Sequence, residues 1–394
     1  MNDSLIALVF AVLVVAASLV SVELAISISI VEILAGVIGG NFLGLHTTPW
    51  LEFLAGLGSI LLTFLAGAEV DTDAMRKNLK ESLLIGSFSF VVPFLGAWAF
   101  AHYIVHWALR ASLIAGIALS TTSLAVVYAV LVETGLNTTA IGQIIMASCF
   151  VTDFGTALTL NVIFSELTWK TLIFVLLSAV VIYLAPKVTP RLFKRYSERV
   201  VEPEIKFIFL ALFFFMFLGA FSGSHAVLPA FIFGLVLSPV FSRHPAVQRK
   251  LRIVAFAVLT PAFFIKAGFN VSIRDIYLSM VPLAGFLAIK LLAKGIGVYP
   301  FAHRFVAEDS LFTTLLMSTG LTFGTISSTY GLSAGIIDRS QFSILVTVVL
   351  LSAVVPTFVA QRWFQPKVGF DGGLAQLVGA VAADDSGRGE AVAQ

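Results

Sequence analysis

Residues 150–160 read FVTDFGTALTL, inside a hydrophobic stretch from about 139 to 165 that is long enough to span a bilayer. Asp153 lies near the middle of that stretch. A carboxylate in hydrocarbon costs about 2.5–3.5 kcal/mol even on lenient insertion scales, so Asp153 is a candidate functional residue. Asp153 also borders a polar stripe at helical spacing, formed by Ser148, Thr152, Thr156 and Thr159. We therefore expect this helix to turn Asp153 towards the protein interior or a water-filled cavity.

The composition excludes a soluble domain. Of 394 residues, 59% are hydrophobic and 12% are charged, and repeated hydrophobic runs of this kind predict an all-α polytopic membrane protein. The single cysteine, Cys149, excludes an internal disulfide and a Cys-based metal cluster, and we interpret it as a small buried hydrophobic residue. There is no Gly-rich phosphate loop, no Ser/His/Asp arrangement, no His cluster and no basic nucleic-acid face. The sequence therefore predicts neither an enzyme nor a resident cofactor or metal.

Hydrophobic runs between polar or Gly/Pro breaks predict about thirteen helices. We place them near residues 4–21, 27–45, 51–69, 82–105, 111–133, 139–165, 168–190, 203–223, 225–241, 252–270, 276–299, 309–331 and 340–364. The Ala/Gly-rich tail, 365–394, is expected to be disordered and cytoplasmic.

The distribution of Lys and Arg predicts the orientation. The first run, MNDSLIALVF, has no basic residue before it, so we expect an uncleaved spanning helix with an outward N-terminus. Thirteen spans then place seventeen basic residues in cytoplasmic segments and four in outside loops, which agrees with the positive-inside rule. The C-terminus is accordingly predicted to be cytoplasmic, in the cell membrane.

Weak internal similarity predicts two inverted six-helix repeats. FLAGAEVDTD (64–73) resembles FIKAGFNVSIRD (264–275), mostly at an offset of 201, and the same offset aligns ALSTTSLAV (118–126) with TGLTFGTIS (319–327). SIVEILAGVIGG (29–40) weakly resembles AVLPAFIFGLVLSP (226–239). The repeats would span 1–165 and 203–364, with a linker helix and loop at 166–202. Because one linker helix separates the two six-helix units, the two repeats enter the membrane in opposite senses, as in secondary transporters.

Two hydrophobic segments contain clusters of hydroxyls and glycines that weaken helical continuity. The first cluster contains Ser120, Thr121, Thr122 and Ser123, and the second contains Thr319, Gly320, Thr322, Gly324 and Thr325. Paired interruptions in two halves point to a transporter site, where freed carbonyls can coordinate a cation. The alternative is close helix packing through small residues.

A lone carboxylate with nearby hydroxyls and backbone oxygens suits a partly hydrated monovalent cation better than Ca²⁺ or Mg²⁺. Burial also favours the protonated form of a carboxyl, so a cation and a proton would compete at Asp153. Lys290 and Lys294 lie four residues apart on one helix face, and either could pair with Asp153. In the alternative reading, Asp153 serves only as their structural partner. Lys266 is a third lysine within a predicted span.

The order of these motifs resembles the monovalent cation:proton antiporter superfamily, closest to its bacterial Kef/Nap-type sodium/proton exchanger branch. The motifs are SIVEILAGVIGG, FLAGAEVDTDAM, ALSTTSLAVVYAVLVETG, VTDFGTALTL, TPAFFIKAGFNVS and KLLAKGIGVY, over residues 5 to 362. The resemblance implies a homodimer and two crossed, interrupted helices in a core that moves like an elevator against a dimerisation domain. It also implies that Asp153 is the ion-binding aspartate, that Thr122 is the threonine of the first interrupted helix, and that Lys294 is the basic residue beside the site.

The chain departs from this family at two positions. Members commonly carry Asp, Asn or Gln directly before the key aspartate, whereas here Thr152 precedes it. The hydroxyls of Thr152 and Ser123 are both expected to belong to the ion site. The missing acid favours one-for-one electroneutral exchange, although the partner of Lys294 stays open. Lys266 stands where an apolar or small residue is expected.

The leading hypothesis is a secondary Na⁺/H⁺ or K⁺/H⁺ antiporter. Two alternatives are a sodium-coupled symporter of an organic anion, for which Lys266 is the only hint, and a non-transporting membrane scaffold or sensor of the same fold. No motif distinguishes Na⁺, Li⁺ and K⁺.

Overall fold

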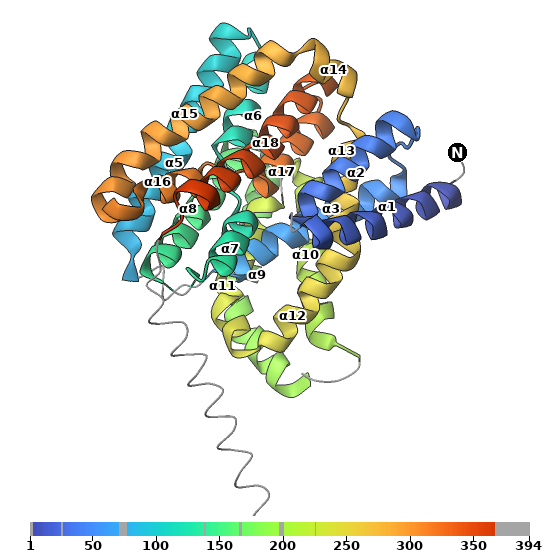
Figure 1. The fold of residues 1–394 in the computed structure, drawn as a ribbon. Helices are drawn as coiled ribbons and strands as arrows, with labels where there is room; N and C mark the ends of the chain where they lie inside the picture. The colour runs from blue at the N-terminus through green and yellow to red at the C-terminus, as the bar shows by residue number, and fades with distance from the viewer. Residues whose placement is uncertain are drawn as a thin grey trace, which may run out of the picture.

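The computed structural model describes residues 3–24, 27–70, 77–137, 139–164, 168–196, 201–224 and 226–366, and these form helices with no β-strand among them (Figure 1). The helices are α1 (Asp3–Leu24), α2 (Ile28–Phe42), α3 (Pro49–Ala68), α5 (Leu79–Ala99) with η1 (Phe100–Ile104), α6 (Leu109–Ser120), α7 (Leu124–Glu133), α8 (Ala140–Phe164), α9 (Trp169–Tyr196), α10 (Pro203–Ser222), α11 (Val227–Arg243), α12 (Pro245–Val254), η2 (Ala255–Leu259), α13 (Thr260–Phe269), α14 (Ile273–Leu278), α15 (Met280–Phe305), η3 (Ala307–Asp309), α16 (Ser310–Met317), α17 (Thr322–Ser333) and α18 (Arg339–Trp363).

The predicted all-helical membrane protein is confirmed. Within the described residues, nine helical segments are long and apolar enough to cross a membrane, and α2, α6 and α11 are shorter apolar helices. Helices occupy every one of the predicted hydrophobic segments, while the number of thirteen spans stays a prediction. The predicted disordered tail lies outside the described residues from 367 onwards, as do residues 165–167 and 197–200 around the predicted linker.

The helices pack as two bundles (Figure 1). In the first, which we call the α3 bundle, α3 packs on α11 and α13, α2 packs on α1 and α13, and α9 packs on α10 and α11. In the second, the α8 bundle, α5 packs on α6, α8 and α15, and α17 packs on α6 and α18. The bundles meet where α11 contacts α8, and where α14 contacts α18. The seam between them holds the cavities described below.

Glycines allow two close helix crossings within the α3 bundle. A Cβ on Gly268 of α13 would lie 2.7 Å from Cα of Gly36 in α2, and a Cβ on Gly234 of α11 would lie 2.8 Å from the backbone nitrogen of Ala68 at the end of α3. Such approaches are possible only without a side chain at those points. They fix how α2 crosses α13 and how α3 crosses α11.

The order of helices recurs along the chain. The starts of α1, α2, α5, α6, α7 and α8 precede those of α10, α11, α15, α16, α17 and α18 by about 200 residues in each case. Under this correspondence, the α2–α13 crossing matches the α3–α11 crossing. Both observations support the predicted inverted repeats, which stay a prediction together with their boundaries.

Candidate functional site

The two predicted helix interruptions are present, and they face each other. Helix α6 ends at Ser120 and α7 begins at Leu124, while α16 ends at Met317 and α17 begins at Thr322. Thr121 adopts an extended conformation with φ −65° and ψ 155°. The backbone groups at the breaks are therefore released from regular helical hydrogen bonding in the middle of the α8 bundle.

Hydrogen bonds join the two breaks directly. The Thr122 hydroxyl donates to the Met317 carbonyl over 3.0 Å, and the Ser123 amide donates to the Thr319 hydroxyl over 3.4 Å. The Ser123 hydroxyl accepts from the Val126 amide at the start of α7. The interrupted helices thus form one unit rather than two separate irregularities.

The hydroxyls before the first break serve α6 itself. Ser120 donates to the Ile117 carbonyl over 2.9 Å, and Thr121 donates to the Ala118 carbonyl over 3.1 Å. These two predicted site residues therefore satisfy the last carbonyls of a helix that has no continuing turn.

Lys294 of α15 binds this unit. Its Nζ donates to the Thr122 hydroxyl and to the Ser89 hydroxyl of α5, each over 2.9 Å, and all three side chains are buried. Because the Thr122 hydroxyl also donates a hydrogen bond to the Met317 carbonyl, one hydrogen-bonded chain connects α5, α15 and both breaks. Sequence reasoning missed Ser89, which is one of many hydroxyls in the hydrophobic segments.

Lys290 lies one turn before Lys294 and is fully buried. Its Nζ has no hydrogen-bond partner among the described residues. A Cβ on Gly320 would overlap this Nζ and would lie 3.2 Å from the Thr121 hydroxyl oxygen. Gly320 therefore leaves the space for a cationic group where α6 and α16 end, and a positive charge is favourable at helix C-termini.

Gly324 has a different role, which matches the alternative of close packing. A Cβ there would lie 2.9 Å from the Ala118 carbonyl oxygen and 2.8 Å from a methyl carbon of Val349. The neighbouring Thr325 hydroxyl donates to the Leu321 carbonyl. These positions let α17 approach α6 and α18 and do not line the cavity beside Asp153.

Asp153 of α8 is 3% exposed, and its Oδ1 has no hydrogen-bond partner among the described residues. The hydroxyls near it are occupied within the helix: Thr152 donates to the Cys149 carbonyl over 2.6 Å, and Thr156 donates to the Thr152 carbonyl over 2.8 Å. Asp153 therefore keeps a free acceptor atom, because the neighbouring threonine hydroxyls donate their hydrogen bonds to backbone carbonyls instead.

Asp153 lines a cavity of about 650 Å³ at the seam between the bundles. Thr322, the first residue of α17, lines it as well. The polar residues that line this cavity also include Asn137, Gln143, Gln248 and the ion pair of 2.7 Å between Glu69 and Arg252. We call it the Asp153 cavity. Two of its lining residues, Gln248 and Arg252, belong to α12, which lies in the lower part of Figure 1.

Asp153 forms no ion pair with the buried lysines of α15. Among the described residues, no nitrogen–oxygen distance of 4.0 Å or less joins Asp153 to Lys290 or Lys294. Lys294 instead uses its hydrogen bonds on two hydroxyls. The role of these lysines as charge partners of Asp153 stays a prediction.

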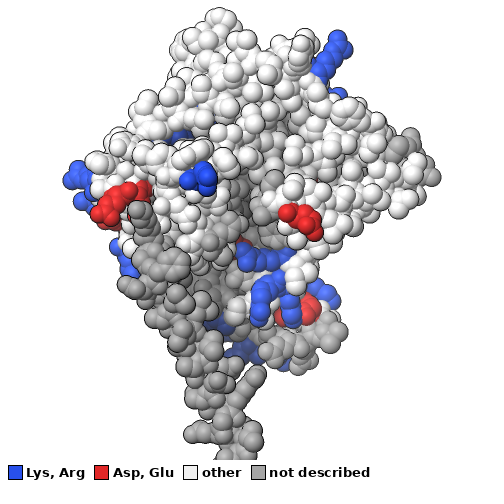
Figure 2. Space-filling view, viewed as in Figure 1, with Lys and Arg blue, Asp and Glu red and all other residues white. Residues whose placement is uncertain are grey.

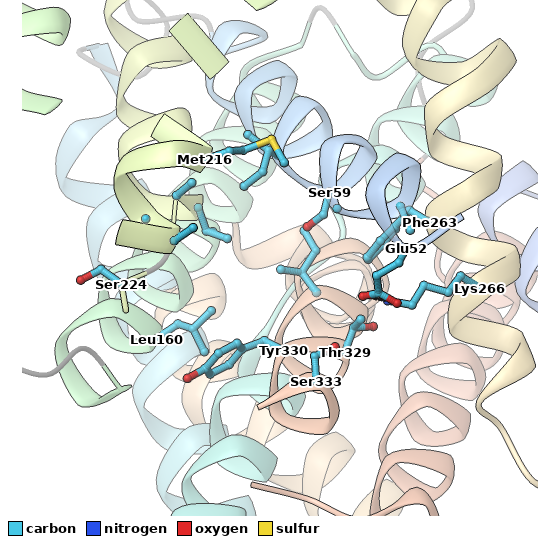
Figure 3. A pocket seen from close by; sticks show the side chains of 18 residues that line it. Glu52, Ser59, Leu160, Met216, Ser224, Phe263, Lys266, Thr329, Tyr330 and Ser333 are labelled. Atoms are coloured by element: carbon cyan, nitrogen blue, oxygen red, sulfur yellow. Dashed lines mark hydrogen bonds and ion pairs between the residues drawn. The ribbon is translucent and has the colours of Figure 1, made fainter. Parts of the chain in front are cut away.

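A second cavity, of about 250 Å³, lies at the opposite end of α3 (Figure 3). It is lined from the α3 bundle by Glu52, Ser59 and Lys266, among others, and from the α8 bundle by Leu160, Thr329, Tyr330 and Ser333. We call it the Glu52 cavity. Asp153 does not line it.

A cluster of phenylalanines lies at the seam beside the Asp153 cavity. Phe231 of α11 is buried, and its ring centroid lies 5.2 Å from that of Phe150 and 6.2 Å from that of Phe154, both on α8. Its edge also meets Phe323 of α17 at 5.9 Å. Phe231 of the α3 bundle thus packs at the seam against three phenylalanines of the α8 bundle.

Comparisons with known proteins agree with this architecture. Residues 7–365 match the model of the family described as sodium/hydrogen exchanger, transmembrane. The chain is 26% identical over 358 residues to the probable Na⁺/H⁺ antiporter 3 of Methanocaldococcus jannaschii, covering 86% of this chain and 90% of that protein. It is 23% identical to the Na⁺/H⁺-K⁺ antiporter GerN of Bacillus cereus, covering 88% and 93%.

The fold is similar to a solved structure. The sodium proton antiporter MjNhaP1 from Methanocaldococcus jannaschii at pH 8 superposes with a TM-score of 0.69 at 15% identity, covering 93% of this chain and 100% of that one. The family match spans nearly the whole chain, from α1 to the end of α18, and includes both broken helices and Asp153. The chain is therefore an integral membrane protein that belongs to the sodium/hydrogen exchanger family.

Proposed function

We propose that this protein exchanges a monovalent cation, Na⁺ or K⁺, for H⁺ at Asp153. The observation that carries the proposal is a buried carboxyl with a free acceptor oxygen that opens onto a large cavity. The relatives support the reaction class, since their names describe Na⁺/H⁺ and Na⁺/H⁺-K⁺ antiporters, and a 26% identical yeast relative is named K⁺/H⁺ antiporter 1.

The exchange follows from one group serving two ligands. The carboxyl of Asp153 holds either a proton or a cation, and the arrival of one releases the other because burial disfavours an uncompensated charge. Oxygen ligands beyond the carboxylate are available from water in the cavity and from Thr322 at its wall. Because Thr152 is not an acid, a single carboxyl handles both ligands, which favours exchange of one cation for one proton.

Lys294 would hold the broken helices around this site. Its hydrogen bonds to Ser89 and Thr122 keep α5, α15 and the first break in register. We propose that a positive charge on Lys294 also acts on Asp153 and weakens both proton and cation binding, so that neither ligand is trapped.

Alternating access would come from movement of the α8 bundle against the α3 bundle. Both cavities lie on the seam between them and take their linings from both sides. Sliding along this seam would bring Asp153 out of one cavity and towards the other without dismantling either bundle. This is the elevator motion that the family resemblance implies, and the homodimer that it also implies would anchor the α3 bundle.

The membrane orientation is proposed from charge. Figure 2 shows Lys and Arg side chains gathered around α12 at the lower end, whereas the upper part of the view is almost entirely uncharged. Basic residues of that end include Lys187, Arg191, Lys194, Arg195, Arg243, Arg249, Lys250 and Arg252. The positive-inside rule makes this end cytoplasmic, so the Asp153 cavity would open to the cytoplasm.

The structure weakens the case for an organic-anion symporter. That alternative depended on Lys266 as a free cationic ligand for an anion. Lys266 instead donates to Glu52 over 2.5 Å. The pair is neutral overall and offers no uncompensated positive charge.

The experiment is proton flux in proteoliposomes under an imposed pH gradient, with Na⁺, Li⁺, K⁺ or choline added in turn and voltage clamped by valinomycin and K⁺ or left free. Asp153→Asn should abolish cation-dependent flux while leaving insertion and dimerisation intact. Glu32→Gln is the matched control, because Glu32 is also buried in a helix with an unpartnered oxygen but lines neither cavity.

Each outcome decides something. Flux that is cation-specific and requires Asp153 supports the antiporter, names its cation and shows whether charge moves. Full flux in Asp153→Asn would remove the site assignment. A well-folded wild-type protein without flux for any cation would favour the non-transporting alternative.

A further inference from the structure

Each of the two cavities contains one ion pair, and both pairs join the same two helical segments. Glu52, in the first turn of α3, accepts from Lys266 of α13 over 2.5 Å. Glu69, directly after the end of α3, accepts from Arg252 of α12 over 2.7 Å. The two acids are seventeen positions apart, which corresponds to about 25 Å of helix, so the pairs lie at opposite ends of one antiparallel packing.

In the Glu52 cavity the acidic side chain, Glu52, is exposed and the basic side chain, Lys266, is buried. The side chain of Glu52 is 54% exposed, whereas that of Lys266 is 6% exposed. In Figure 3 the two side chains point towards each other from neighbouring helices, and Thr329 and Ser333 of α17 lie beside them. A cation entering this cavity would therefore meet the carboxylate first, with the lysine behind it.

Two further groups in this cavity lack partners. The hydroxyl oxygens of Thr329 and Ser224 are buried, and neither has a hydrogen-bond partner among the described residues. They line the cavity from the two different bundles. A volume of about 250 Å³ has room for several water molecules at about 30 Å³ each. A carboxylate, free hydroxyls and water are the oxygen donors that a hydrated monovalent cation uses.

We propose that the Glu52 cavity is the vestibule that receives the cation on the membrane side opposite the Asp153 cavity, and that Lys266 sets cation occupancy there by cancelling the charge of Glu52. Glu69 and Arg252 do the same for the Asp153 cavity. This inference rests on the proposed exchange function. It explains why a lysine stands at a position where an apolar residue was expected: the base is matched to an acid that faces the cavity.

The charge logic predicts opposite effects for the two members of a pair. Lys266→Gln leaves Glu52 uncompensated and concentrates cations in its cavity, whereas Glu52→Gln leaves Lys266 uncompensated and repels them. A unit charge within about 10 Å of a partly hydrated site changes occupancy by about threefold to tenfold at low ionic strength. The double variant Glu52→Gln/Lys266→Gln restores a neutral vestibule.

The test is the apparent KM for the cation, measured separately from each face of proteoliposomes in which the protein has one orientation. Lys266→Gln should lower KM on the Glu52 side by about threefold to tenfold, and Glu52→Gln should raise it by a similar factor. The double variant and Lys266→Arg should return close to the wild-type value. Raising the ionic strength to about 0.5 M with choline chloride should shrink both shifts.

The Glu69–Arg252 pair supplies the matched control. Arg252→Gln and Glu69→Gln should shift KM in the same two directions, but on the Asp153 side. Each single variant should change KM on its far side by less than about twofold, because that side is about 25 Å away and screened. Size-exclusion profiles and melting temperatures identify any variant that misfolds, and the charge-reversed pair Glu52→Lys/Lys266→Glu then provides the replacement measurement.

The outcomes separate this inference from the proposed function. Shifts of equal size on both faces, or a raised KM in Lys266→Gln, would overturn the vestibule while leaving Asp153-dependent exchange in place. Absence of any cation-dependent flux in the wild-type protein would overturn both the vestibule and the proposed exchange function. Side-specific shifts of opposite sign establish the vestibule.

Discussion

Replacing Lys294 tests whether this lysine is held by hydroxyls, as its hydrogen bonds indicate, or by an ion pair with Asp153. Its ammonium is fully buried and its two hydrogen-bond partners are the neutral hydroxyls of Ser89 and Thr122. Burying an ion costs several kcal/mol, and a hydrogen bond to a charged group returns about 1.5–3 kcal/mol. The two terms are similar, so Lys294→Met should change the free energy of unfolding by less than about 1.5 kcal/mol.

Lys294→Ala removes more than the ammonium. It deletes three methylene groups that are worth about 0.8 kcal/mol each when buried, and it leaves a void between α5 and α15. Together these terms give a loss of about 2–4 kcal/mol. The comparison of Met with Ala therefore separates packing from charge at one position.

The measurement is the melting temperature of purified protein in detergent at one fixed scan rate, where 1 kcal/mol corresponds to roughly 1–2 °C for a chain of this size. We expect a drop of roughly 2–8 °C for Lys294→Ala and under roughly 3 °C for Lys294→Met. If Lys294 instead completed a buried ion pair, both variants would lose about 3–5 kcal/mol. Equal, large drops would therefore refute the reasoning, and an unchanged pH profile of exchange in both variants would remove the proposed electrostatic action on Asp153.

Two substitutions test the close approaches. Gly320→Ala should displace the Lys290 ammonium from between the breaks and reduce exchange by at least about tenfold. Its effect on stability should be small, because the atom that it meets is the end of a flexible side chain, and unchanged exchange would contradict the placement of Lys290. Gly234→Ala should destabilise the protein by about 1–3 kcal/mol, because its Cβ meets the backbone of Phe64 and Ala68. The control is Gly295→Ala, which has open space at its Cβ and should melt at or slightly above the wild-type temperature. Equal melting temperatures for the two variants would refute the tight α3–α11 crossing.

The sequence predicted the features that depend on local chemistry. Runs of hydroxyls and glycines inside hydrophobic segments predicted both breaks, because several residues of low helix propensity follow one another there. Asp153 was selected as a candidate by the energetic penalty of a carboxylate in a hydrophobic segment, which needs no knowledge of its neighbours, and its role as the ion site stays a prediction.

Helix ends were less accurate where proline occurs. The segments expected to end near 190 and 299 continue as α9 to Tyr196 and as α15 to Phe305, with Pro190 and Pro300 inside them. Proline removes one backbone donor and favours a stop, but membrane helices tolerate it when other groups satisfy the freed carbonyl. The surrounding packing decides this, and a single segment does not reveal it.

Pairings between distant residues were beyond sequence reasoning. Lys294 meets Ser89 across 205 residues, and Lys266 meets Glu52 across 214. Each base had many possible partners among the spans. The choice depends on which helices cross, and the glycines that set those crossings are indistinguishable in sequence from other small residues.

If access alternates by the proposed slide of the α8 bundle, the spacing of the two cavities along α8 sets the size of that slide. On α8, Asp153 lines one cavity and Leu160 lines the other. On α17, Thr322 lines the first cavity together with Phe323, and Thr329 lines the second together with Ile326, Tyr330 and Ser333. The pairs Asp153/Leu160 and Thr322/Thr329 have the same spacing. Both separations are seven residues, which is about 10 Å of helix and close to two turns, so the same helix face is presented. A slide of about 10 Å of the α8 bundle would therefore place Asp153 in the Glu52 cavity.

Cysteine cross-linking across the seam tests this slide. In the present state Phe231 stacks on Phe150, so a cysteine pair at 231 and 150, in a Cys149→Ser background, should cross-link readily. After a two-turn slide, position 231 would face Gln143 instead, seven residues earlier on α8. As the concentration of the transported cation is varied, the yield of the 231–143 cross-link should rise and the yield of the 231–150 cross-link should fall. Reciprocal yields support an elevator motion along this seam, whereas a constant 231–150 yield during full exchange would show that access alternates without it.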